Sequence, residues 1–406
     1  GVTVAEGARV NLNGQTPGAL ATGGYAWTIA GDGGDGVGGV GAITNSGGAV
    51  YGNSGIKSLT LSANAEIGGN SGRFDVGLHA GSSTYGTISG GGFTLTKVGS
   101  SEPCLRAPAS NITYVHESGT MWFEDYDTAS GTNAITVNGT ATLGTYGTRS
   151  IANDVSMASG TTLTNLGGGT GTWTGALTLG GALNINTGGN IVIDGSIAGS
   201  GNITRSNGNT LVLQNTGASY SGRIINNAGT LRIESPSATG TYAGADAITM
   251  AAGTTLQGGT ITAQASATVG TSTTGIVQGG AITYDAGTGN TLTIAGPVSG
   301  TGNIAKSNNT GIVVFNGNVS TDGSMTGDGG GFTIGSGLTL TNATNGVLRA
   351  QNGNTLTFGA AANVNVRRLQ LGTGTINITP GATVTSGGLI TSDGSGNVST
   401  VNQTGG

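Results

Sequence analysis

Apolar residues recur every 20 positions through the middle of this chain. The columns are Val137, Met157, Leu177 and Ile197; Leu143, Leu163, Leu183 and Ile203; Ile191, Leu211 and Leu231; and Trp173, Ile193, Leu213 and Ile233. The last two columns lie two residues apart, so their members share one face of a strand. Positions one period apart stack when a chain winds into coils, and the steps within a period allow three short strands separated by bends. The sequence therefore predicts an all-β fold, a parallel β-helix.

The same period returns nearer the C-terminus. The later columns are Leu292, Ile312 and Phe332; Ile294, Val314 and Ile334; and the pairs Leu356/Ile376, Val364/Val384 and Leu369/Leu389. In the N-terminal third, apolar residues alternate but keep no fixed period. We predict a single solenoid over residues 1–406, with irregular coils in 1–130 and regular 20-residue coils in 131–406. At 20 residues per coil, the 406 residues give about 20 coils.

The composition alone would also suit a disordered chain. There are 84 glycines, only 8% of the residues are charged and 4% are aromatic. The periodicity argues against disorder, because a disordered chain has no reason to place Leu, Ile and Val at a fixed spacing. In a β-helix the glycines occupy the sharp bends, where positive φ costs glycine least.

Charge and hydropathy exclude two classes of partner. A net charge of −5 with 13 Lys and Arg offers no basic cluster for nucleic acid or for an anionic membrane surface. No apolar run reaches the length of a membrane span.

The single cysteine, Cys104, excludes an internal disulfide. The chain begins in a strand-like pattern at Val2 and Val4 with no leader pattern, so we expect a processed or trimmed product.

The stretch from Ile197 to Ile233 carries a specific series of phrases. They are Gly199 and Gly201 before Ile203 and Arg205, the strand pair Leu211 and Leu213, Tyr220 with Gly222, and Ala228-Gly229-Thr230-Leu231. This series resembles the autotransporter-associated β-strand repeat. Its opening phrase recurs at 298–306, ending in Lys306, and at 88–97, ending in Lys97. The resemblance implies a right-handed parallel β-helix in a bacterial cell-surface or secreted protein.

Residues 102–127 form the main compositional anomaly, with two prolines, Cys104, His116, several aromatics and clustered acids. One interpretation is an inserted loop that binds a sugar on Trp122 or Tyr126, or Ca²⁺ on three carboxylates, Glu124, Asp125 and Asp127. The other is an irregular coil or a covering insertion with its aromatics packed inward. We favour the structural interpretation, because the acids lack the alternating ligand spacing of a Ca²⁺ loop.

Enzyme signatures are sparse. His79 and His116 are the only histidines, so a Ser-His-Asp triad has few candidate members. A polysaccharide lyase or hydrolase would need acids or bases one period apart, whereas Asp154, Asp194 and Asp246 lie at unrelated phases. The glycine-rich run at 31–36 is typical of a turn. We expect no enzyme activity, and no catalytic, cofactor-binding or metal site.

These observations favour a structural β-solenoid of a bacterial cell-surface or extracellular assembly, either a passenger stalk or a filament subunit. The alternative is an adhesin whose polar lateral faces bind glycans or host proteins. Strand-like patterns without a cap occur at both ends of the sequence, from Gly1 to Gly14 and around Val398 and Val401. Either caps lie in sequence outside the given chain, or the chain is a homo-oligomer joined through the solenoid ends; we favour the homo-oligomer.

Overall fold

The structure, a computed structural model, is an all-β parallel β-solenoid of about 15 turns. It describes residues 1–16, 24–36, 39–50, 55–70, 72–78, 86–214, 219–233, 246–250, 254–258, 267–269, 272, 275–278, 281–390 and 400–403. The chain divides into two compact units, an N-terminal unit Gly1–Gly201 and a C-terminal unit Asn202–Gly406. No helix within the described ranges is long and apolar enough to cross a membrane.

The N-terminal unit is built from three ladders of parallel strands, one on each face of the coil. The first contains β1 (Val2–Val4), β3 (Tyr25–Gly31), β5 (Ile56–Gly68), β7 (Ile88–Ser89), β10 (Ala109–Ser110), β15 (Arg149–Ile151), β18 (Thr170–Trp173) and β21 (Asn190–Ile193). A short 3-10 helix, η2 (Asp127–Ser130), contacts both β10 and β15 and takes the place of a strand between them.

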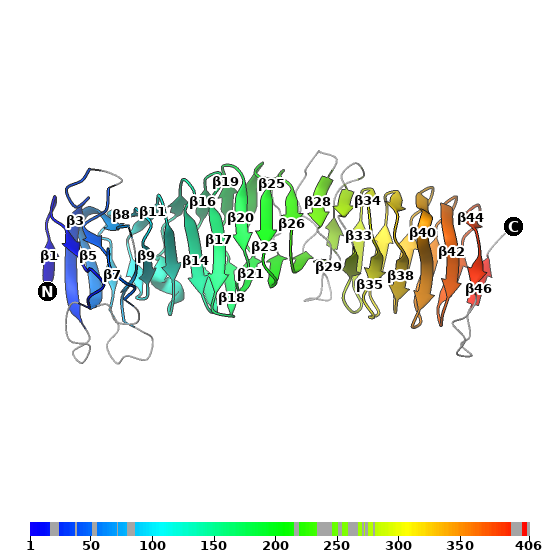
Figure 1. Cartoon of the computed structure of the whole chain (residues 1–406), viewed down its shortest axis with the longest axis horizontal. Helices are drawn as coiled ribbons and strands as arrows, with labels where there is room; N and C mark the ends of the chain where they lie inside the picture. Colours follow the sequence, from blue (N-terminus) through cyan, green and yellow to red (C-terminus); the bar gives the residue numbers. More distant parts are fainter. Residues whose placement is uncertain are drawn as a thin grey trace. The chain divides into compact units, whose positions relative to one another are not determined.

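The second ladder of this unit contains β2 (Val10–Asn11), β4 (Ile43–Thr44), the C-terminal end of β5, β8 (Thr94–Lys97), β11 (Thr113–His116), β13 (Ile135–Val137), β16 (Val155–Met157), β19 (Leu177–Leu179) and β22 (Ile197–Gly199). The third contains β6 (Arg73–Val76), β9 (Glu102–Leu105), β12 (Thr120–Phe123), β14 (Thr142–Tyr146), β17 (Thr162–Leu166) and β20 (Leu183–Asn186). Figure 1 shows β14, β17 and β20 side by side in this order. Backbone hydrogen bonds therefore run from coil to coil.

The C-terminal unit also has three parallel ladders. The first contains β23 (Ile203–Ser206), β26 (Ile224–Asn226), β28 (Asp246–Met250), β31 (Gly275–Gln278), β34 (Val298–Gly300), β37 (Val319–Thr321), β40 (Thr339–Gln351), β42 (Asn363–Leu371) and β44 (Thr383–Ser386). The second contains β24 (Thr210–Leu213), β27 (Thr230–Ile233), β29 (Thr254–Gly258), β32 (Ile282–Asp285), β35 (Ile304–Lys306), β38 (Met325–Asp328), the C-terminal halves of β40 and β42, and β45 (Leu389–Ile390).

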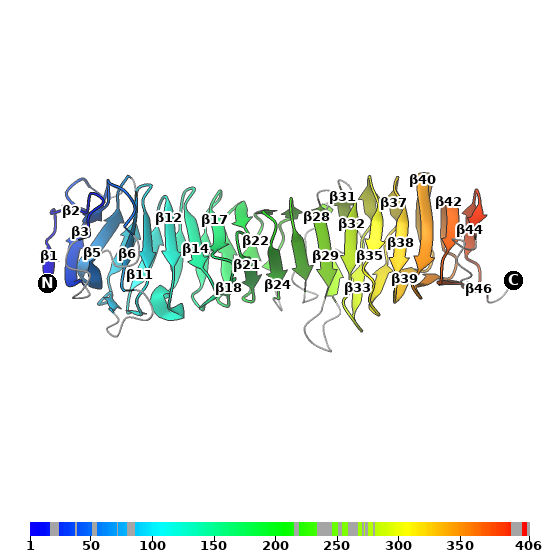
Figure 2. The same cartoon turned by 60° about the horizontal axis from the view of Figure 1, so that its bottom comes forward.

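The third ladder of the C-terminal unit contains β30 (Ala267–Val269), β33 (Thr291–Ile294), β36 (Ile312–Phe315), β39 (Gly331–Ile334), β41 (Thr355–Phe358), β43 (Thr375–Ile378) and β46 (Thr400–Gln403). A further short strand is β25 (Ser219–Tyr220). The view in Figure 2 follows β35, β38 and β40 as consecutive members of the second ladder.

The apolar columns form the interior in both units. The 20-residue register is confirmed for several predicted pairs: Val137/Met157, Leu143/Leu163, Trp173/Ile193, Leu211/Leu231 and Leu356/Ile376. Most of these side chains are fully buried. Alternate residues of each short strand point inward, so stacked apolar side chains fill the space inside the coils.

Two predicted columns are wrong by two residues. Met157 pairs with Leu179 rather than Leu177, and Leu163 pairs with Ile185 rather than Leu183. Tyr146 pairs with Leu166 and Arg149 with Gly171. The turn around 167–169 therefore has two more residues than the corresponding turn of the preceding coil, at 147–148. Gly167 and Gly168 both adopt positive φ, which lets this glycine-rich turn absorb the extra residues.

The register predicted around β36 is wrong by one residue. Leu292 pairs with Val313 and Ile294 pairs with Phe315, so Ile312 and Val314 do not belong to the interior columns. Val313 and Phe315 are fully buried, whereas Ile312 is 41% exposed. All four residues from Ile312 to Phe315 are apolar, so alternation in the sequence cannot reveal which two point inward. A slip of one residue turns every side chain to the opposite face.

The predicted number of coils is too high, since the structure has about 15 turns rather than 20. Long coils occur in both units. In the C-terminal unit, Ile224 pairs with Ile248 and Ile248 with Ile276.

The N-terminal unit has the longest coils. Val10 pairs with Ile43, Ile43 with Ile67 and Ile67 with Lys97, so these coils are all longer than 20 residues. The strand pairings nevertheless continue from coil to coil.

Residues 102–127 form strands of the solenoid. They supply β9, β10, β11 and β12, followed by the start of η2. Tyr114 and Phe123 are fully buried and meet edge to face at 5.7 Å between ring centroids. Trp122 is also buried, with 7% of its surface exposed. Tyr114 and Phe123 thus pack inward, and Trp122 is too buried to present a platform on which a sugar could stack, whereas Tyr126 is half-buried.

Candidate functional site

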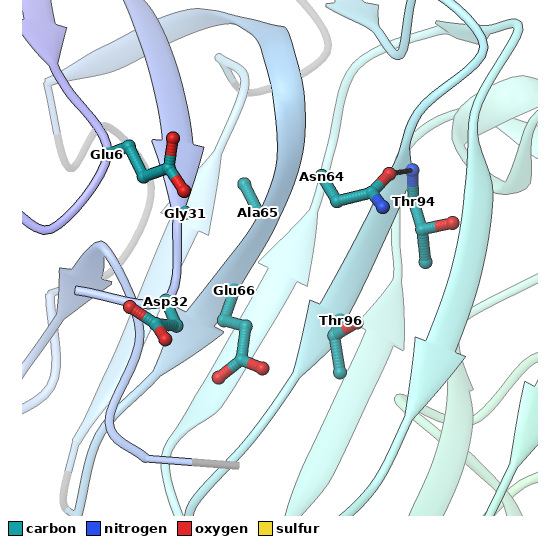
Figure 3. A pocket seen from close by; sticks show the side chains of 8 residues that line it. All are labelled: Glu6, Gly31, Asp32, Asn64, Ala65, Glu66, Thr94 and Thr96. Atoms are coloured by element: carbon teal, nitrogen blue, oxygen red, sulfur yellow. Dashed lines mark hydrogen bonds between the residues drawn. The ribbon is translucent and has the colours of Figure 1, made fainter. Parts of the chain in front are cut away.

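An open pocket of about 370 Å³ in the N-terminal unit brings three carboxylates together. It is lined by Glu6, Gly31, Asp32, Asn64, Ala65, Glu66, Thr94 and Thr96 (Figure 3). Glu6 follows β1, Asp32 follows β3 and Glu66 lies in β5, so the three acids come from successive coils of one stack. We call this pocket the acidic groove.

The polar lining of the acidic groove is held in place by the coil backbone. Oδ1 of Asn64 accepts a hydrogen bond from the backbone N–H of Thr94 at 2.9 Å. Oδ1 of Asp32 accepts one from the backbone N–H of Gly34 at 2.8 Å, which makes the start of the glycine-rich run a turn. Glu66 is buried, with 6% of its surface exposed. Carboxylates, an amide and threonine hydroxyls together can bind a ligand rich in hydroxyl groups.

The sequence did not reveal this groove, because the acids are not one 20-residue period apart. The coils that carry them are longer, and Gly31 pairs with Ala65 through a local register shift. A sequence signal for their proximity was the apolar alternation Trp27/Ile29 and Leu59/Leu61 that precedes Asp32 and Glu66, because these two alternating stretches pair in the structure. In the ranges that the structure describes, no group of three or more His, Cys, Asp or Glu side chains is placed to hold a metal ion.

A second group of charges is buried near β6, β9 and β12. Asp75 is fully buried between two guanidinium groups, with Arg73 Nε at 2.7 Å and Arg106 Nη1 at 2.8 Å. Arg73 also reaches Glu124 at 2.5 Å, and Arg106 reaches Asp125 at 2.7 Å. We call these five residues the buried ion cluster. Every charge in it has an opposite charge in contact, which is the condition under which buried charges are tolerated.

The buried ion cluster explains the acids that the sequence offered as Ca²⁺ ligands. Glu124 and Asp125 are bound by arginines of neighbouring coils, and Asp127 lies 3.7 Å from Arg149. The thiol of Cys104 is fully buried beside them and donates a hydrogen bond to Oε2 of Glu124 at 3.1 Å. Burial raises the pKa of Cys104 well above its usual value. The thiol therefore stays protonated and is a poor nucleophile.

Three buried cations share one type of environment: Lys97, Arg205 and Lys306. Each ends or nearly ends a strand, and its head group bonds both to its own turn and to the next coil. Lys97 Nζ donates to the carbonyls of Val98, Gly99 and Ser118 at 2.9, 2.7 and 2.7 Å. Burial lowers the pKa of Lys97 to about 7, while these three acceptors favour its ammonium form.

Glycine in the facing turn makes room for two of these cations. A Cβ on Gly119 would lie 2.8 Å from Lys97 Nζ, and one on Gly229 would lie 2.5 Å from Arg205 Nη2. Both glycines also adopt positive φ. We expect Gly119→Ala to lower the free energy of unfolding by at least about 1 kcal/mol, measured by urea titration. Gly147→Ala, at positive φ with open space around it, is the control and isolates the part due to φ alone.

His116 lies one coil beyond Lys97 and is fully buried. Its Nε2 lies 3.1 Å from the carbonyl oxygen of Ser118, so the neutral ring can donate this bond. Burial, together with the charge of Lys97, lowers the pKa of His116 from 6.5 to about 3. Between pH 3 and 6.5 the unfolded chain therefore binds the proton more tightly than the folded chain.

Stability should consequently rise with pH across this window, because of His116, by up to about 1.4 kcal/mol per pH unit. Urea titrations at a series of pH values, compared with His116→Gln, measure this slope. The variant should lose it, while the slope due to carboxylates remains in both proteins. Equal slopes for the two proteins would contradict a buried neutral imidazole.

The remaining residues singled out in the sequence are dispersed. Asp154 and Asp194 are exposed, and Oδ1 of Asp154 accepts a hydrogen bond from the backbone of Ala176. Asp154 follows β15 and Asp194 follows β21, two coils further along the same ladder with β18 between them, so the two acids do not lie on adjacent coils. Asp246 begins β28, but its side chain lies outside what the structure describes, as does the whole of His79.

Comparisons with family models, with curated proteins and with solved structures found no match to this chain. The resemblance at 197–233 therefore rests on its residues. The structure gives three of them a contact within the C-terminal unit. Arg205 Nη1 bonds Oδ1 of Asn226 at 2.9 Å, Tyr220 Oη donates to the carbonyl of Arg223 at 2.6 Å, and Gly229 faces the Arg205 head group.

Proposed function

We propose that this chain is a structural β-solenoid of a bacterial cell-surface or extracellular assembly, a stalk or a filament subunit. The observation that carries the proposal is the role of the repeat phrase. Arg205, Tyr220 and Gly229 all make contacts that join a turn to its own strand or to the next coil. A phrase whose members hold coils together supports a structural role, and the resemblance to autotransporter repeats supports the location.

The location can be tested on the organism that makes the protein. Antibodies raised against the purified chain should label intact cells, or should detect the chain in the culture fluid. Digestion of intact cells with protease should remove the label, with a cytosolic enzyme as the internal control. Label that depends on cell lysis would contradict the proposed surface or extracellular location.

The acidic groove supports a second candidate function, an adhesin that binds glycans. Its carboxylates would accept hydrogen bonds from sugar hydroxyls, each worth about 1.5–3 kcal/mol. We expect the double variant Asp32→Asn, Glu66→Gln to bind a glycan array roughly tenfold more weakly than the unchanged protein. Asp194→Asn, an exposed acid outside the groove, should bind unchanged.

The same proteins can be assayed for cleavage of pectin, alginate and similar polymers. We propose that the chain is not an enzyme, so no reducing ends or unsaturated uronides should form. Their appearance, with loss in the groove variant, would favour a lyase or hydrolase instead. Equal glycan binding by the groove variant and the unchanged protein would remove the groove from the adhesin proposal.

A further inference from the structure

The third buried cation, Lys306, differs from Lys97 in what surrounds it. Lys306 ends β35, is 2% exposed, and its Nζ donates to the carbonyl oxygens of Ser307, Asn309 and Asp328 at 2.8, 2.9 and 3.2 Å. Nζ also lies 3.3 Å from Oδ1, the side-chain amide oxygen of Asn309. The three hydrogen bonds of Lys97 all go to main-chain carbonyls, with no side-chain amide among them. Of these two buried lysines, Lys306 is thus the one whose amine faces a carboxamide.

The carboxamide of Asn309 is held and polarised from two sides. Its Nδ2 donates to Oδ1 of Asp285 at 2.7 Å, and its Oδ1 accepts from the backbone N–H of Gly311 at 3.0 Å. Asp285 ends β32, the strand that pairs with β35, and its Oδ1 is fixed by the backbone N–H of Gly287 at 2.8 Å. The amine of Lys306, the polarised carbonyl of Asn309 and the carboxylate of Asp285 therefore meet where the turn after β35 packs against the end of β32.

We propose that Lys306 and Asn309 join spontaneously in an intramolecular isopeptide bond, with Asp285 as the proton carrier. The neutral amine of Lys306 attacks Cγ of Asn309, and the Nζ–Cγ bond forms. Asp285 takes a proton from Nζ and delivers it to Nδ2. The Cγ–Nδ2 bond then breaks, and the nitrogen leaves as ammonia with its two original hydrogens and the transferred proton. The sum is amine plus carboxamide giving secondary amide plus ammonia, with no oxidant or other reactant.

Four physical effects favour this step. Fixing the amine against the carboxamide replaces a bimolecular encounter with a unimolecular one, which is worth several orders of magnitude in rate. The Gly311 N–H points at the oxygen on which negative charge develops during attack. The carboxylate of Asp285 already contacts the nitrogen that must be protonated before it leaves. Burial also lowers the pKa of Lys306, which increases the fraction of neutral amine.

The bond would close a covalent ring within the turn between β35 and β36. Because the same ring would persist in the unfolded chain, it would reduce the conformational entropy gained on unfolding, as other cross-links do. The amide keeps one N–H on Nζ, which can still donate to one of the carbonyls that Lys306 contacts, such as that of Asp328 in the next coil. The inference concerns this turn alone and does not depend on the proposed surface location.

Intact mass of the purified full-length protein tests the proposal. The folded protein should be lighter than its sequence mass by one molecule of ammonia, about 17 Da. Trypsin should no longer cleave after Lys306, and fragmentation should place the link between Lys306 and Asn309. Lys306→Arg keeps the cation but lacks the attacking amine, and Asp285→Ala lacks the proton carrier. Both variants should show the full sequence mass.

Lys97→Arg is the matched control, because it alters the other buried lysine and should keep the loss of one ammonia. Circular dichroism of each variant establishes that it has folded. Full sequence mass in the unchanged protein after prolonged incubation at neutral and mildly alkaline pH would overturn the proposal, whatever the variants do. A loss of ammonia that persists in Lys306→Arg would overturn it too, since it would then arise at another asparagine.

Discussion

Replacing Val313 with aspartate should destabilise the C-terminal unit severely, whereas the same change at its neighbour Ile312 should be tolerated. Val313 is fully buried opposite Leu292 and Phe332, and Ile312 is 41% exposed. A carboxylate at position 313 would be buried without a partner, at a cost of several kcal/mol. At position 312 it would remain in water. Urea titration followed by far-UV circular dichroism should show a large decrease in the urea concentration at the unfolding midpoint for Val313→Asp, and little change for Ile312→Asp.

The pair of variants separates the register of the structure from the 20-residue register expected from the sequence. In that expected register, Ile312 lies in the interior column with Leu292 and Phe332. The two aspartate variants have the same charge and lie at adjacent positions, so each is a control for the other. A larger loss of stability for Ile312→Asp than for Val313→Asp would show that β36 does not pair with β33 in the register of the structure.

Asp75→Asn should also lower the free energy of unfolding by about 3–5 kcal/mol, because breaking a buried ion pair leaves its partner uncompensated. Asp75 contacts two guanidinium groups, Arg73 and Arg106, and Arg106 is only 3% exposed. Asparagine keeps the volume of the side chain but removes the charge that both arginines face. The measurement is again the urea midpoint, read at neutral pH.

Arg9→Met is the control for the buried ion cluster. Arg9 forms an ion pair with Asp35 whose side chains are 33% and 45% exposed. Exposed pairs contribute about 0–1 kcal/mol, so this variant should shift the midpoint little. High salt should not rescue Asp75→Asn, because buried pairs are poorly screened. Near-native stability of Asp75→Asn would contradict a stabilising role for the cluster.

The periodicity of the sequence was enough to predict a parallel β-solenoid. Columns such as Leu143/Leu163 and Leu211/Leu231 stack as expected, because turns of equal length keep each coil at 20 residues. The prediction failed where a turn changes length, as at 167–169, or where a strand is apolar on both faces, as in β36. Turn length is set by backbone conformation, and a glycine-rich sequence permits several conformations at similar cost.

The polar interior was much harder to predict. Arg73, Asp75, Arg106 and Glu124 come together only because coils of unequal length stack in a particular register. The acidic groove was missed for the same reason, since Asp32 and Glu66 lie on neighbouring coils that are much longer than 20 residues. The repeat phrase did show that Lys97, Arg205 and Lys306 occupy equivalent positions, each at the end of the opening phrase. Their shared role, capping carbonyls of their own turn and of the next coil, required the structure.

Self-association is the property that separates a filament subunit from a single stalk, and the filament is the form of the proposed structural role that we expect. A coil of a parallel solenoid offers unpaired backbone groups to a further strand, and copies that pair in this way without closing a ring form filaments. Sedimentation velocity of the purified chain over a wide concentration range measures this association. We expect species heavier than the 39.1 kDa chain whose proportion grows with concentration. A single species of 39.1 kDa at every concentration would contradict the filament account.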